Sequence, residues 1–163
     1  MDVDPLPLAE ISRILGLLEI LDDHGGRQDI YKLAKELQFE SSDLVDVIRG
    51  AETLGLVTTP GGDVDILESG TEVAKGDANT IKAILRSRML EIPLFQYVKG
   101  KLEEEEDHQM PRRKVEELLT QILPTYNPEE QFLGLVNWGR YAEIFGYNRD
   151  HDIFYLDEGQ TLE

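Results

Sequence analysis

The sequence of 163 residues contains no cysteine and is poor in basic residues. Without cysteine the chain can form no disulfide, thiolate nucleophile or cysteine zinc site, which is compatible with a reducing compartment. Its 16 lysines and arginines against 33 aspartates and glutamates give a formal net charge of −17. Because cations that neutralise phosphates drive the binding of polyanions, this charge argues against nucleic acid and anionic membranes as partners.

Long apolar runs and nucleotide-binding motifs are also missing. No apolar run approaches the roughly 18 residues of a membrane-spanning helix, and the acidic start, MDVDP, lacks the basic end of a signal peptide. Neither GxxxxGK[ST] nor GxGxxG occurs in the sequence. We therefore expect a cytoplasmic protein that does not insert into a membrane and that binds no ATP by itself.

Catalytic and metal-binding patterns are scarce as well. The three histidines, His24, His108 and His151, occur in polar turn contexts without metal-site spacing, and we interpret them as surface residues. The acidic run at 103–107 is typical of a solvated helix end, because adjacent carboxylates do not converge on one ion. We predict no catalytic, cofactor-binding or metal-binding residue, and the protein is not expected to be an enzyme.

The clearest positive signal is a helix that leads through a glycine into an aromatic strand, within residues 129–147. Asn127 can cap this helix, and Pro128 suits its first position. We predict that the helix ends at Gly139 and that a strand follows directly, paired with a returning strand at 153–156. The predicted unit is a helix, a glycine and a β-hairpin.

The same order of elements is predicted at residues 41–67, where a helix ends at Gly55 and a hairpin follows. We expect Leu54 and Trp138 to be buried at equivalent places just before their glycines. Trp138, Tyr141 and Tyr147 could line a ligand pocket, but aromatic residues at such a junction are typical of a core, which is our interpretation. Structural roles are therefore assigned to Leu54, Gly55, Trp138, Gly139 and Tyr141.

Helical periodicity precedes both predicted hairpins, and a connecting helix is predicted from Ala78 to Leu90. The predicted fold is α+β and mostly helical, with two tandem winged-helix-like units of three helices and a β-hairpin wing each. We place the first unit at residues 1–76 and the second, together with the connecting helix, at 77–163. The two are expected to form one compact domain.

A winged helix raises the alternative of a DNA-binding transcriptional regulator. Its predicted recognition helices, at 41–54 and 127–140, are acidic and would repel DNA phosphates. A weaker alternative is a sensor that binds a small ligand between the two units. Two basic clusters form a candidate surface for an acidic protein partner, although balancing acidic neighbours is the role we favour: Lys82, Arg86, Arg88, Arg112, Arg113 and Lys114.

Two stretches of the sequence resemble the C-terminal AAA-associated domain: PLPLAEISRILGLLEILDDHGGRQDIYKLAKEL at 5–37 and NWGRYAEIFGYN at 137–148. That family follows the ATPase module in ABC transporter ATP-binding proteins of the nitrate, sulfonate, taurine and bicarbonate type. The resemblance implies a non-catalytic accessory or regulatory domain of an anion or organosulfonate importer, cytoplasmic and peripheral to the inner membrane through the transporter complex.

The implied partners are the ABC ATPase module and, through it, a membrane permease. A homo-oligomer with a second copy of this chain is left open by the sequence. ATP and magnesium would bind only to the associated ATPase, so the chain itself is expected to carry no cofactor. The phosphate-binding loop and the signature motif of that ATPase are absent from these residues. The sequence is therefore either an excised domain or a stand-alone relative.

Overall fold

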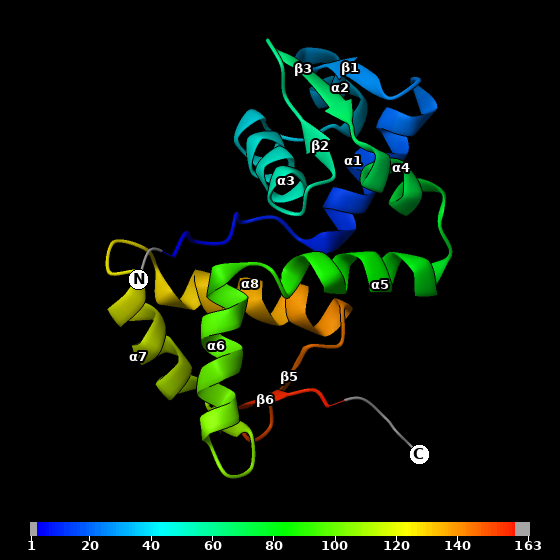
Figure 1. Cartoon of the computed structure of the whole chain (residues 1–163). Helices are drawn as coiled ribbons and strands as arrows, with labels where there is room; N and C mark the ends of the chain where they lie inside the picture. The colour runs from blue at the N-terminus through cyan, green and yellow to red at the C-terminus, as the bar shows by residue number, and fades with distance from the viewer. Residues whose placement is uncertain (1–2, 159–163) are drawn as a thin grey trace. The chain divides into compact units, whose positions relative to one another are not determined.

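The computed structural model describes residues 3–158 and divides the chain into two compact units. We call Pro7–Arg88 the first unit, and Met89–Glu163 together with Met1–Leu6 the second unit. In the described residues the fold contains eight helices and two antiparallel three-stranded sheets, which confirms the predicted α+β, mostly helical class (Figure 1). The division into domains at residues 76 and 77 stays a prediction.

The first unit is centred on α1, whose buried face contacts α2, α3, α4 and β3. Its sheet has the order β1–β3–β2, and α5, which extends to Met89, corresponds closely to the predicted connecting helix. The elements are α1 (Ile11–Asp23), β1 (Arg27–Asp29), α2 (Ile30–Leu37), α3 (Ser41–Thr53), β2 (Val57–Thr58), β3 (Asp63–Ile66), α4 (Glu68–Lys75) and α5 (Ala78–Met89).

Local capping fixes where α1 ends and α2 begins. The Gly26 N–H donates to the Leu21 carbonyl at 2.7 Å, and Gly26 has a left-handed φ of 97° that glycine adopts without steric cost. Three residues later the Asp29 carboxylate accepts hydrogen bonds from the N–H groups of Tyr31 (2.9 Å) and Lys32 (3.2 Å). The short strand β1 is thus held between a defined helix end and a capped helix start.

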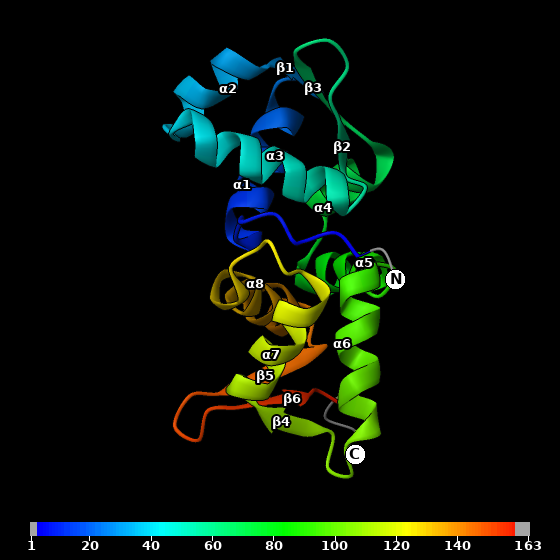
Figure 2. The same ribbon diagram turned by 90° about the vertical axis from the view of Figure 1, so that its left-hand side faces the viewer.

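The second unit packs α6, α7 and α8 against a sheet of order β4–β6–β5 (Figure 2). Its elements are α6 (Pro93–Glu104), β4 (Gln109–Pro111), α7 (Arg112–Ile122), α8 (Pro128–Tyr141), β5 (Phe145–Asn148) and β6 (Ile153–Leu156). The core is aromatic: the Phe145 ring lies 5.4 Å from that of Phe95 and 5.0 Å from that of Phe154, between centroids. Trp138 is fully buried beside Phe95.

A buried glutamine attaches the N-terminal segment to the second unit. The side chain of Gln131 is 3% exposed, accepts from the Leu6 N–H at 2.8 Å and donates to the Leu6 carbonyl at 3.1 Å. Both polar groups of one backbone residue are satisfied by one amide, as burial requires. Leu6 therefore belongs structurally to the second unit.

The two units repeat one arrangement: a helix, a strand, two helices and two strands, with the first strand paired to the third. Backbone hydrogen bonds recur at equivalent places in the two units. In each of the following pairs, the bond of the first unit comes first and its equivalent in the second unit comes second, and the N–H donor is written before the carbonyl acceptor. The pairs are Leu56 to Ala51 (2.9 Å) and Ile144 to Gly139 (2.8 Å); Ile66 to Gly26 (2.7 Å) and Leu156 to His108 (3.0 Å); Leu67 to Leu56 (2.9 Å) and Asp157 to Ile144 (2.8 Å); and Ile30 to Gly62 (3.3 Å) and Arg112 to Asp152 (2.9 Å).

These bonds correct the predicted equivalence of the two helix ends. Helix α3 ends as expected, with Leu54 as its C-cap and Gly55 left-handed at a φ of 71°. Helix α8 instead continues through Gly139, and the left-handed residue after its C-cap is Glu143, with a φ of 59°. Gly55 is thus equivalent to Glu143, four residues beyond the predicted Gly139.

Two further expectations at this junction are wrong because α8 continues beyond Gly139. Tyr141 lies in the last turn of α8 rather than in a strand, and the strand begins at Phe145. Gly139 is needed for packing rather than for a turn, because a Cβ there would lie 2.6 Å from Cδ2 of Phe145. Trp138 and Leu54 are both buried, but they are not equivalent in the repeat.

Each sheet has a third strand where the sequence predicted only a hairpin. β1 and β4 are three residues long and lack the apolar alternation by which strands are found in a sequence.

Among the described residues, no helix is both long and apolar enough to cross a membrane.

Candidate interaction sites

The histidines lie at the surface, as the sequence predicts. Nε2 of His24 lies 2.8 Å from Oε2 of Glu36, and Nδ1 of His108 lies 2.5 Å from Oε1 of Glu158. His151 is exposed in the turn between β5 and β6. Within residues 3–158, no three histidine, aspartate or glutamate side chains are grouped so that they could hold a metal ion.

The first predicted basic cluster lies on α5 of the first unit and consists of Lys82, Arg86 and Arg88. The Arg88 guanidinium covers Gly55: a Cβ on that glycine would meet Nη1 at 2.5 Å. Gly55 follows the C-cap of α3, where the negative end of the helix dipole favours a nearby positive charge. Arg88 therefore packs against the end of α3 and is not simply a solvated charge.

The second predicted cluster opens α7 of the second unit and is partly neutralised there. Nε of Arg112 donates to Glu116 at 2.8 Å, and its guanidinium lies 4.6 Å from the centroid of the Phe132 ring. The hydrogen bond with Glu116 is the main reason why the pKa of Arg112 is raised. Lys114 donates to Glu105 at 3.0 Å.

Arg113 is the exception in the second cluster, because it is exposed and has no ion-pair partner among the described residues. The contacts of Arg112 and Lys114 follow the role that the sequence favoured, the balancing of acidic neighbours. Whether the six cations form an interaction surface stays a prediction, and the structure places three of them in each unit.

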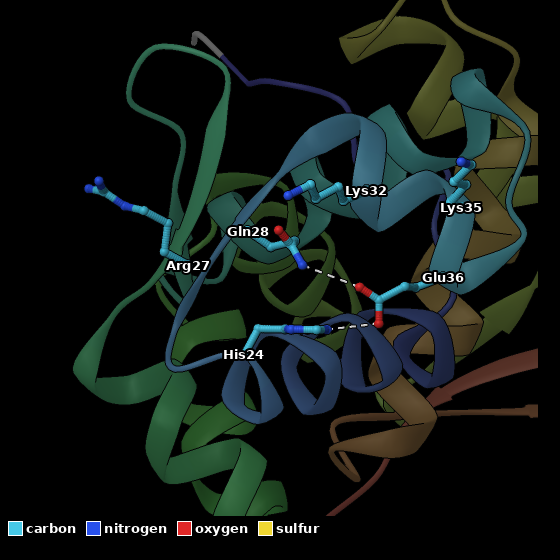
Figure 3. A pocket seen from close by; sticks show the side chains of 6 residues that line it. All are labelled: His24, Arg27, Gln28, Lys32, Lys35 and Glu36. Carbon is cyan, nitrogen blue, oxygen red and sulfur yellow. Dashed lines mark hydrogen bonds and ion pairs between the residues drawn. The ribbon is translucent and has the colours of Figure 1, made fainter.

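Sequence reasoning missed a pocket of about 480 Å³ in the first unit, which we call the α1–α2 pocket (Figure 3). It is lined by six residues from the end of α1, from β1 and from α2: His24, Arg27, Gln28, Lys32, Lys35 and Glu36. His24 and Gln28 converge on the Glu36 carboxylate, and Nε2 of Gln28 donates to Oε1 at 3.2 Å. This carboxylate is therefore already engaged on both oxygens.

Arg27 faces away from the other side chains of the pocket in Figure 3 and is paired across the sheet. Its Nε and Nη2 donate to the two oxygens of Asp65 at 2.5 and 2.6 Å. These bidentate hydrogen bonds raise the pKa of Arg27 and lower that of Asp65. Asp65 is therefore ionised well below neutral pH, and it offsets the charge of Arg27.

Lys32 and Lys35 remain exposed on α2, and neither forms an ion pair with any described residue. They are three positions apart, so they are neighbours on the helix surface. The signal that could have revealed them was the grouping of Arg27, Lys32 and Lys35 in a chain that is otherwise acidic. That these cations share a pocket depended on the fold of α1 against α2, which the sequence does not display.

Among protein-family models, the C-terminal AAA-associated domain matches residues 31–148. This is well over half of the chain, runs from α2 into β5, and includes parts of both units. It is the family that the two quoted stretches of the sequence resemble. No curated protein and no solved structure matches the chain.

Proposed function

The chain belongs to the C-terminal AAA-associated domain family, and from this premise we propose that it is a non-catalytic accessory domain that regulates the ATPase of an ABC importer for anions or organosulfonates. The observation that carries this proposal is the extent of the family match, which includes parts of both units. A domain associated with an ATPase acts by binding it rather than by performing its chemistry.

The proposed mechanism is a coupling free energy between this domain and its ATPase. A domain that binds two states of an enzyme with different affinity shifts their populations by that difference, typically about 1–3 kcal/mol. ATP and magnesium would bind to the partner ATPase, and the permease would be reached through it. The complex would lie on the cytoplasmic side of the membrane.

We further infer that each unit is a winged helix adapted to protein contact. The order of elements supports this, because a strand, two helices and a hairpin follow the first helix in both units. Acidic residues on the helix before each hairpin favour a protein partner over DNA: Asp43, Asp46 and Glu52 on α3, and Glu129 and Glu130 on α8.

The test uses the cognate ABC ATPase and permease, reconstituted in vesicles. ATP hydrolysis is measured without the chain and with it added in excess, across concentrations of nitrate, taurine and bicarbonate. We expect maximal turnover to change little and the half-activating solute concentration to shift by a factor of about 5 to 150. Identical rates and solute dependence in both conditions would contradict a regulatory role.

A pair of surface variants examines whether the α7 cluster takes part. Arg113→Glu reverses an exposed charge in the candidate surface, and Arg149→Glu makes the same change in the exposed turn after β5 of the same unit. If the cluster contacts the ATPase, only Arg113→Glu should weaken the effect on hydrolysis. Equal behaviour of the two variants would place the contact elsewhere.

A further inference from the structure

The α1–α2 pocket concentrates positive charge on a chain whose formal net charge is −17. Three of its six lining side chains are cationic and one is a carboxylate. Asp65 offsets Arg27, and His24 and Gln28 occupy the carboxylate of Glu36. Two lysine ammonium groups are left without an ion pair in the described chain, beside a pocket whose other polar groups are engaged.

The second unit acts as an internal comparison, because it has the same arrangement but carries most of the cations of the equivalent helix at other positions. Arg27 and Gln109 are the first residues of β1 and β4, so position 28 corresponds to 110 and position 32 to 114. Met110 is buried where the first unit has Gln28. Lys114 corresponds to Lys32 but is paired with Glu105 at 3.0 Å.

The contrast extends to the next turn of the helix. Glu117 takes the place of Lys35, and Leu118 takes the place of Glu36. The second unit therefore forms the same arrangement of helices and strands with a negative charge in place of Lys35 and an apolar residue in place of Glu36. The unpaired lysines of the first unit are therefore not needed to build the fold, and their ammonium groups are available for binding beside the pocket.

We propose that the α1–α2 pocket binds a small anion, with its negative group in contact with the ammonium groups of Lys32 and Lys35. The pocket has a volume of about 480 Å³, is open to solvent and is lined by polar and charged side chains, which suits a small hydrophilic ion. The acidic residues elsewhere do not prevent this, because charges farther away than about 10 Å are largely screened at 0.1 M ionic strength. Carboxylates and sulfate-type oxoanions share the chemistry that two lysines recognise.

A small anion fits these observations better than nucleic acid does. DNA would extend beyond the pocket along the helices of this unit, where α3 carries Asp43, Asp46 and Glu52. A ligand confined to the pocket meets the lysines of α2 and does not extend along α3.

Binding is measured on the full chain by two-dimensional amide NMR at about 0.1 M ionic strength, with sodium sulfate and sodium succinate as separate probes. Sodium chloride at matched ionic strength gives the reference. We expect saturable shifts in the residues of the α1–α2 pocket with at least one of the two probes. The stronger probe tells whether the site prefers an oxoanion or a dicarboxylate.

The double variant Lys32→Gln/Lys35→Gln should weaken this binding about tenfold for each lysine removed. The matched control is Lys101→Gln/Lys114→Gln, which removes two lysines from the second unit, including the equivalent of Lys32. Glutamine is a good helix former, so neither variant should disturb the helices. The control should bind both probes as the unchanged chain does.

Three results would overturn the proposal: no saturable shift beyond that of sodium chloride, equal weakening by the two double variants, or Lys32- and Lys35-dependent binding of a DNA duplex without binding of either small anion. None of these measurements needs an ATPase. If the chain binds neither anion, the proposed regulatory role is unaffected. If the chain does not change ATP hydrolysis, the anion site is still tested by the NMR titration.

Discussion

Two glycines on the same helix give the sharpest test of how the second unit is packed. Gly134 and Gly139 both lie inside α8, yet a Cβ meets different surroundings at the two places. At Gly139 it would lie 2.6 Å from Cδ2 and 2.9 Å from Cβ of Phe145. At Gly134 the nearest atom is Cδ1 of Leu6 at 3.4 Å, an ordinary contact.

Alanine substitutions at Gly134 and Gly139 are therefore expected to change the free energy of unfolding in opposite directions. An alanine in a helix interior gains about 0.8–1 kcal/mol over glycine, and Gly134→Ala should realise most of this gain. At Gly139 the same gain is opposed by overpacking, which typically costs about 1–3 kcal/mol. The Phe145 ring cannot move aside freely, because it packs between Phe95 and Phe154. The overpacking cost should therefore lie in the upper part of its range, at about 2–3 kcal/mol, and we expect Gly139→Ala to be destabilised by about 1–2 kcal/mol net.

Urea unfolding followed by tryptophan fluorescence measures this difference directly. Trp138 is the single tryptophan and is buried in the second unit, so its emission reports on the unit that contains both glycines. With a urea dependence of about 1–3 kcal/mol per molar, the two variants should have midpoints about 1 M apart. Shifts of both midpoints in the same direction would refute the packing argument for Gly139.

Three further outcomes are expected. Glu143→Gly should stabilise the second unit by about 0.5–1 kcal/mol, because it removes a side chain from a left-handed residue. Gly55→Ala makes the opposite change and should destabilise the first unit by at least about 1 kcal/mol. Thermal unfolding of the two variants shows whether the melting temperature rises for the first and falls for the second. Trp138→Ala should cost about 3–5 kcal/mol in urea unfolding followed by circular dichroism, since the variant has no tryptophan, and a near-unchanged midpoint would contradict its core position. A labelled DNA duplex at physiological salt should bind no more tightly than about 10⁻⁴ to 10⁻⁶ M, and saturable sequence-dependent binding would restore the DNA-binding alternative.

The features that the sequence predicted well depend on local chemistry. Asn127 caps α8 as expected, since its side chain accepts from the N–H groups of Glu129 (2.8 Å) and Glu130 (3.2 Å). The end of α3 at Gly55 was likewise predictable, because a glycine after an apolar helical stripe is the commonest helix terminator. Such signals involve residues within one turn of each other and need no knowledge of the fold.

The errors arise where distant residues determine the local structure. A glycine near the end of a helix has two uses, and Gly139 serves close packing against Phe145 rather than termination. The true terminator, Glu143, has a side chain that gives no sign of a left-handed conformation. Likewise β4 pairs with β6, whose residues follow more than 40 positions later, and this pairing makes a strand of QMP.

The repeat separates the residues that build the fold from those that are free to change. The hydrogen bond that closes the start of α2 on its hairpin, from the Ile30 N–H to the Gly62 carbonyl, recurs in α7 from the Arg112 N–H to the Asp152 carbonyl. The side chains at these equivalent positions differ completely. Because a backbone bond is indifferent to the side chain, the position tolerates either an aliphatic residue or a cation.

Whether a basic side chain is paired within its own unit depends on the acceptors around it. In the second unit, Arg112 is held by Glu116 and the Phe132 ring and contributes to packing, so its charge is used within the unit. In the first unit, Lys32 and Lys35 have no such acceptors and remain exposed. An exposed ion pair adds little stability, so losing one in the first unit would cost the fold little. The first unit can therefore keep its positive charge for a ligand while the second keeps the same backbone arrangement intact.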